Sequence, residues 1–155
     1  MARVGRWLAR GRSEHGAQLV EFALVLPLLL LVMLGIAEFG FVFQRYEVVT
    51  NAAREGARVA VLPGYGAPPY PDVRPRVVAY LSSGRVPVTS LNPKVDVEEV
   101  LIPVPAGRPS ISAKRVTVTY TYTFQFLSAL SAFFGSNYTT VDLSAVSEMR
   151  TEAGS

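Results

Sequence analysis

The sequence contains no cysteine and a single histidine, and charged side chains make up only 17% of its residues. Without cysteine there are no disulfide bonds and no thiolate metal ligands, so packing alone must hold the fold together. The one histidine, His15, precedes the main apolar stretch. We find no H-E-x-x-H motif, serine nucleophile elbow or phosphate-binding loop. We therefore expect no enzyme activity, catalytic residue, cofactor, metal site or small-molecule substrate.

Hydrophobic residues, in contrast, make up 50% of the chain and are concentrated in one long run. The stretch Leu19–Phe43 has Glu21 and Glu38 as its only charges. As a helix it would extend about 37 Å, which is enough to cross a hydrocarbon core of about 30 Å with some tilt. This predicts a membrane-spanning helix over about 19–43. The alternatives are a buried helix of a soluble protein, which the rest of the chain is too small to cover, and a cleaved signal peptide, whose apolar region is shorter.

The net charge of +3 comes from the first sixteen residues, which contain four arginines and one glutamate. Basic and acidic side chains balance in the rest of the chain, so the charge predicts no nucleic-acid partner. Arginines just before an apolar helix follow the positive-inside rule. We expect a single-pass protein whose N-terminus is cytoplasmic and whose C-terminal domain is extracytoplasmic.

Three regions are predicted from the pattern: a flexible basic leader (1–16), a long helix (17–62) and an extracytoplasmic α+β domain (63–155). Beyond Phe43 the helix becomes amphipathic, and Glu55 and Arg58 form an i,i+3 pair on its wetter side. Gly56 destabilises a helix by about 1 kcal/mol relative to alanine, so it needs a packing reason. That reason is close packing either on the protein's own sheet or on another subunit. The residues that recur at helical spacing are Tyr46, Val49, Ala53, Gly56, Ala57 and Ala60, of which the last four form a small-residue face.

The remaining sequence predicts a short helix followed by strands. Asp72 is expected to cap a helix over Val73–Ser83 that Gly84 ends. Alternating apolar residues predict strands over Lys94–Ile102, Lys114–Phe126 and Tyr138–Met149, and a short helix or apolar loop is expected over Leu127–Phe134. The simplest assembly is an α+β fold. In it, the membrane helix continues into an amphipathic helix that packs on a small antiparallel β-sheet.

The junction of leader and helix reads Gly16-Ala17-Gln18-Leu19-Val20-Glu21-Phe22. A basic leader ending in glycine, a glutamate five residues later and a long apolar helix resemble the processing signature of type IV-like prepilins. The aromatic residue after the glutamate resembles the Flp/Tad (tight adherence) branch. More specifically, the runs 16–27, 35–40 and 50–58, together with the closing stretch 143–152, are similar to the TadE-like family of pilin-like proteins.

This resemblance implies a minor pseudopilin, a membrane-inserted subunit that helps to assemble a thin adhesive pilus. It implies that a prepilin peptidase cuts between Gly16 and Ala17. The other implied partners are pilin-like subunits and the pilus assembly platform. The implied location is the cytoplasmic (inner) membrane and, once assembled, a surface filament. The alternative function is an unprocessed single-pass binding module with an extracytoplasmic domain.

The two acidic residues of the span need an explanation of their own. A carboxylate at the centre of a membrane helix costs about 2.5–3.5 kcal/mol, and less near its edge. Cleavage would place the α-amino group of Ala17 one turn from Glu21. The amine could then neutralise this carboxylate, which Phe22 directly follows, or the carboxylate of a neighbouring subunit. Alternatively, Glu21 reaches the headgroups. Glu38 is expected to reach water at the outer face.

Small residues also occur along the span. Gly35 and Gly40 would let a second helix approach closely, although they are not spaced as G-x-x-x-G. Together with Ala53, Gly56 and Ala57 they form the predicted helix-packing set.

Overall fold

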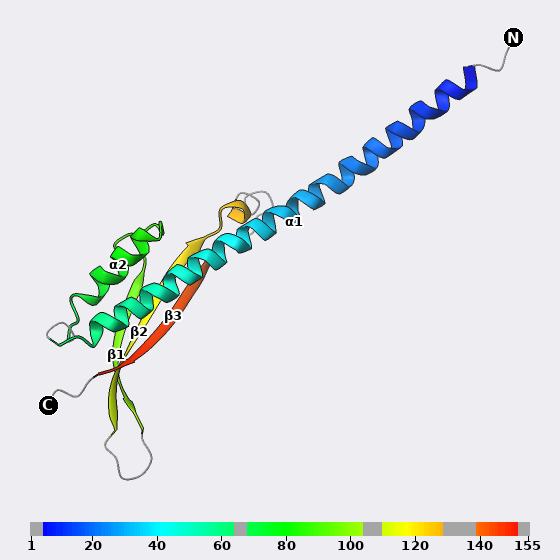
Figure 1. The fold of residues 1–155 in the computed structure, drawn as a ribbon. Coiled ribbons are helices and arrows are strands. Elements are labelled where there is room, and N and C mark those ends of the chain that lie inside the picture. The colour runs from blue at the N-terminus through cyan, green and yellow to red at the C-terminus, as the bar shows by residue number, and fades with distance from the viewer. Residues whose placement is uncertain (1–4, 64–67, 104–109, 129–138, 152–155) are drawn as a thin grey trace. The chain divides into compact units, whose positions relative to one another are not determined.

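The computed structural model describes the backbone of residues 5–63, 68–103, 110–128 and 139–151, and side chains from Gly16 onward. The chain divides into two compact units, Met1–Phe39 and Gly40–Ser155. The first helix, α1 (Gly5–Ala60), contributes to both units (Figure 1). The units are described separately below.

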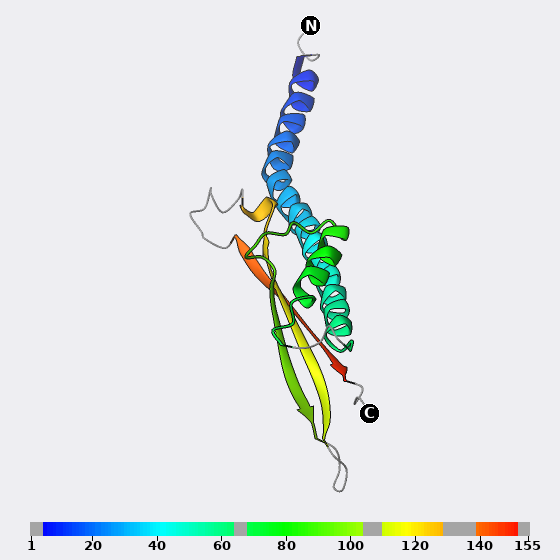
Figure 2. The same cartoon turned by 90° about the vertical axis from the view of Figure 1, so that its left-hand side faces the viewer.

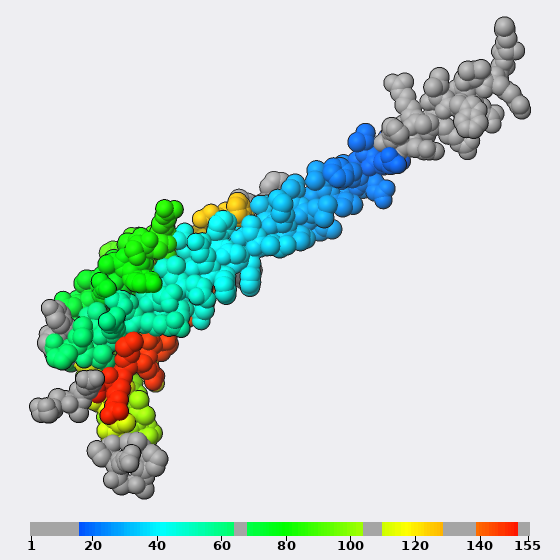
Figure 3. All heavy atoms as spheres, in the orientation of Figure 1, coloured from blue at the N-terminus to red at the C-terminus, as the bar shows by residue number. Residues whose placement is uncertain are grey.

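The first unit is helical from Gly5, so the prediction of a flexible leader over 1–16 is wrong from this residue onward. Alanine, leucine and arginine are good helix formers, and no proline interrupts this segment. Pro27 lies inside α1 without ending it. Every side chain from Gly16 to Ala37 is exposed, and an 18-residue window in this helix has a mean hydropathy of 2.7. Apolar side chains form the outer surface of this part of the helix (blue in Figure 3).

An apolar helix exposed on all sides differs from the core helix of a soluble protein. None of the most hydropathic window is buried inside the protein. By length and composition this helix can cross a membrane.

The second unit begins with the last part of α1, which runs along one face of a sheet with α2 (Val73–Ser83) beside it (Figures 1 and 2). The bounds of α2 agree with the prediction, and Gly84 is its C-cap. The prediction that the Asp72 side chain caps this helix is wrong. This residue has helical backbone angles (φ −88°, ψ −17°) and makes no side-chain cap hydrogen bond, whereas a capping side chain requires an extended backbone.

The sheet has three antiparallel strands in the order β1-β2-β3. These are β1 (Lys94–Ile102), β2 (Ile111–Thr123) and β3 (Thr140–Arg150). The bounds of β1 match the prediction. β2 begins earlier than predicted because Ile111 pairs with Ile102 at the end of the β1–β2 hairpin, and it ends at Thr123, before the predicted end at Phe126. Most of the predicted segment Leu127–Phe134 lies outside the described residues.

Alternate residues of the sheet face the helices, as the sequence pattern predicts. In the central strand Val116, Val118, Tyr120 and Tyr122 are buried, while the threonines between them are less so. The buried core also includes residues of both helices and of β3: Val49, Ala52, Ala53, Ala57, Ala60, Val73, Val77, Leu81, Leu143 and Ala145. The α+β fold class, with a long apolar helix and a helix-covered antiparallel sheet, is therefore confirmed.

Candidate functional site

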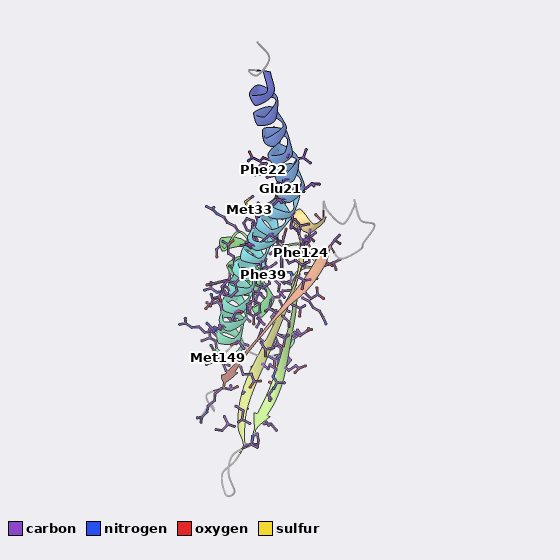
Figure 4. The ribbon with its side chains drawn as sticks, turned by 90° about the vertical axis from the view of Figure 1, so that its right-hand side faces the viewer. Glu21, Phe22, Met33, Phe39, Phe124 and Met149 are labelled. Atoms are coloured by element: carbon purple, nitrogen blue, oxygen red, sulfur yellow. The ribbon has the colours of Figure 1, made fainter. Side chains whose placement is uncertain are left out.

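The junction predicted to be processed lies on the exposed part of α1. Gly16, Ala17, Glu21 and Phe22 are all exposed, and Phe22 retains 56% of its accessible surface. A Cβ atom added to Gly16 would meet nothing within 4 Å. Figure 4 shows the Glu21 and Phe22 side chains projecting from the helix. These residues are therefore accessible to a partner.

The glycines of the predicted packing set differ in their surroundings. At Gly35 and Gly40 an added Cβ would meet nothing within 4 Å, so the chain itself does not require glycine there. These two positions leave the backbone of α1 open to a neighbouring helix.

Gly56, in contrast, is enclosed by the second unit. An added Cβ would lie 2.7 Å from Cγ2 of Val77, 3.2 Å from Cγ1 of Val116 and 3.5 Å from Cγ1 of Val73. Ala53 and Ala57, on the same helical face, are fully buried. The small face of α1 is thus used within the chain, against both α2 and the sheet. This favours the first of the two packing reasons considered for Gly56.

Glu38 is not in the environment that its position in the sequence suggests. We expected its carboxylate to reach water, but the residue is only 1% exposed. Glu38 lies four residues before Val42 and seven before Arg45, so the three residues share one side of the helix. The same side is buried at Val49. The side of the helix on which Glu38 lies therefore determines its burial, although the residue is close to the end of the predicted span.

Arg45 has a structural role that the sequence did not indicate. Its guanidinium donates hydrogen bonds to the carbonyl oxygens of Arg85 (2.7 Å) and Gly84 (3.5 Å). These carbonyls follow the C-terminus of α2, where unpaired backbone acceptors favour a cation. Arg45 thus ties the end of α2 to α1.

A second polar cluster joins the segment before α2 to the sheet. The Tyr70 hydroxyl donates to Oε1 of Glu99 (2.9 Å), and Nζ of Lys114 lies 3.4 Å from the same oxygen and 4.5 Å from the centre of the Tyr70 ring. The hydrogen bond from Tyr70, followed by that from Lys114, lowers the pKa of Glu99. Loss of surrounding water raises the pKa of Tyr70, and the bond to Glu99 acts in the same direction. Tyr70 has a left-handed backbone (φ 57°), which is unusual for a non-glycine residue.

The acidic residues of β1 each face a cation. Asp96 pairs with Lys94 (3.2 Å), Glu98 with Arg115 (3.7 Å) and Glu99 with Lys114. Among the described residues no group of three or more histidine, cysteine or acidic side chains is arranged to hold a metal ion. The chemistry of this edge is that of surface ion pairs.

Fold and site together define a class: a protein with an exposed, membrane-compatible N-terminal helix that ends in a small α+β unit. Residues 16–58 match the family model of TadE-like proteins. The predicted TadE-like resemblance is thereby confirmed for this segment, which makes up less than half of the chain. The match does not include the closing stretch 143–152, whose resemblance stays a prediction. No curated protein and no solved structure matches the chain.

Proposed function

We propose that this protein is a minor pseudopilin, a membrane-inserted structural subunit that helps to assemble a Tad/Flp-type pilus. The observation that carries the proposal is the TadE-like match over 16–58, which begins at the glycine of the predicted processing site. The exposed apolar helix supports membrane insertion, because it buries none of its most hydropathic window within the chain. In this role the chain lies in the inner membrane, with a cytoplasmic N-terminus and an extracytoplasmic second unit.

Processing by a prepilin peptidase is the first step of the proposed function. Cleavage between Gly16 and Ala17 removes the basic leader and creates a free α-amino group on Ala17. Without its leader arginines, the helix no longer carries the charges that oppose its movement out of the membrane. The accessible surface of Gly16 and Ala17 is compatible with recognition by another protein.

Charge pairing then selects the neighbouring subunit. Glu21 is exposed on a helix made almost entirely of apolar side chains, where an unpaired carboxylate is costly. The new amino group of Ala17, on the same or a neighbouring chain, neutralises it, and Phe22 packs beside the pair. The open backbone at Gly35 and Gly40 accepts a second pilin-like helix further along the span.

The intact mass of the protein, purified from its native membrane, tests this function. We expect a mass that corresponds to a chain beginning at Ala17. A control culture that lacks prepilin peptidase activity should yield the full-length chain. A full-length chain in the active, assembled material would overturn the proposal and favour an unprocessed anchored binding module.

A further inference from the structure

Exposed apolar side chains gather at one end of the second unit. They come from the first residues of α1 within this unit and from the helical residues 126–128 that follow β2. We call this set the apolar collar; it consists of Phe41 (39% exposed), Phe43 (59%), Tyr46 (42%), Phe126 (38%) and Leu127 (41%). Two of these residues lie far from the other three in sequence, so the fold creates the surface.

The helical residues that follow β2 lie beside α1 (Figures 1 and 2), and an aromatic contact joins them to it. The rings of Phe41 and Phe126 have centroids 6.3 Å apart and are tilted by 39°. The preceding residue pair, Tyr122 and Phe124, packs edge to face at 5.8 Å. The Ser128 hydroxyl donates to the carbonyl oxygen of Gln125 (3.1 Å) at the start of this helical segment. Phe126 therefore lies against Phe41, with Leu127 next to it in the chain.

The depth of Phe41 in the membrane follows from the length of the helix. From Leu19 to Phe41 an α-helix rises about 33 Å, compared with a hydrocarbon core of about 30 Å. If Leu19 marks the inner boundary, Phe41 lies at the outer boundary between acyl chains and headgroups. Tyr46 lies about 7.5 Å further along the helix axis, at the outer edge of the headgroup layer. Phe126, in contact with Phe41, shares its depth.

We propose that the helical segment that begins at Phe126 inserts Phe126 and Leu127 into the outer lipid–water interface and gives the second unit a membrane contact separate from the spanning helix. Aromatic and large apolar side chains favour this interface, where their rings lie between hydrocarbon and headgroups. The partner is the lipid bilayer, because Phe41 and Phe43 end the apolar run of the helix that can cross a membrane, and Phe126 packs on Phe41. This inference rests on membrane insertion, which belongs to the proposed function, and not on processing or pilus assembly.

The contact restricts the unit to one orientation on the membrane. With a single helical connection, the unit could tilt toward the bilayer in any direction. Insertion of Leu127 selects the orientation in which the collar faces the lipid and Leu101 lies away from it. The strand register places Leu101 opposite Ser112, about 36 Å along β2 from its last residue.

Spin labels on single cysteines test this inference, and the cysteine-free chain needs no background substitution. The full chain is placed in lipid nanodiscs as Leu127→Cys, Leu101→Cys or Leu24→Cys, each labelled with a nitroxide. These leucines are 41%, 69% and 76% exposed, so all three accept a label without core disruption. Accessibility to oxygen, which partitions into lipid, is compared with accessibility to a water-soluble nickel chelate.

We expect the oxygen-to-nickel ratio at position 127 to lie well above that at position 101 and toward that at position 24. Equal ratios at 127 and 101, with a high ratio at 24, would overturn the collar while leaving the membrane span intact. Low ratios at all three positions would overturn both the collar and membrane insertion. A Phe126→Ser change in the Leu127→Cys chain should lower the ratio toward that at position 101, and an unchanged ratio would also refute the role of the collar.

Discussion

The enclosed position of Gly56 allows its substitution to be worked out in energetic terms. Alanine at an exposed helical position gains about 1 kcal/mol over glycine. At Gly56, however, the new Cβ would lie 2.7 Å from a γ-carbon of Val77, a distance that forces a shift. Valine has little rotamer freedom, and both Val77 and Val116 are fully buried, so the neighbours cannot move aside easily. Overpacking of this kind costs about 1–3 kcal/mol.

The two effects predict that Gly56→Ala lowers the free energy of unfolding of the second unit by about 1 kcal/mol. Gly40→Ala is the matched control on the same helix, because its Cβ would meet nothing within 4 Å. It should be neutral or stabilising by up to about 1 kcal/mol, so the two variants should differ by about 1–2 kcal/mol. All of the tyrosines lie beyond Gly40, and their near-ultraviolet circular dichroism during urea unfolding of the full chain in nanodiscs reports on the second unit.

A double-mutant cycle with Val77→Ala tests the physical reason. Removing the valine γ-carbons creates room for the new methyl group, so the combined loss should be smaller than the sum of the two single losses by about 1 kcal/mol. If Gly56→Ala is as stable as Gly40→Ala, or if the two changes are additive, the close approach of α1 to α2 does not explain this glycine.

Three further predictions concern charged groups. Glu21→Ala should leave membrane insertion intact but abolish co-purification with the assembled pilus, whereas Glu47→Ala, at an exposed position beyond the span, should assemble normally. Carboxyl-carbon NMR should show Glu99 titrating below its ordinary value of 4.5, and Tyr70→Phe should raise the midpoint toward that value. Because the folded-state pKa is lowered, the Glu99 contribution to stability is present above about pH 4.5 and is lost as the pH falls through the folded-state pKa. Arg45→Met should cost about 1 kcal/mol and accelerate amide exchange at the end of α2, and unchanged exchange would contradict the capping role.

Local periodicity accounts for the parts of the fold that the sequence predicted. The bounds of α2 follow from the spacing of Val73, Val77 and Leu81 together with Gly84, all within one short segment. The faces of β2 and β3 follow from strict alternation, which leaves only one set of side chains for the core. The bounds of α2 and the faces of these strands can therefore be predicted without knowledge of which distant segments are in contact.

Contacts between distant segments account for the features that the sequence missed. Glu55 was expected to pair with Arg58 but forms a 2.6 Å ion pair with Arg76 on α2. Tyr70 meets Glu99 across a separation of 29 residues, and nothing in the linker sequence marks it as an anchor. Such pairs depend on the tertiary arrangement, since their members lie far apart in the sequence.

The distribution of small residues along α1 separates the two uses of this helix. Packing inside the second unit buries Ala53 and Ala57 and encloses Gly56, so another chain cannot contact the backbone at these positions. Gly35 and Gly40 remain open, and the apolar side chains before them are exposed. A partner helix can therefore approach the exposed segment 16–37 closely without disturbing the core around Gly56. Association through the span and stability of the second unit then become separable properties, which substitutions at Gly35 and Gly56 should affect independently.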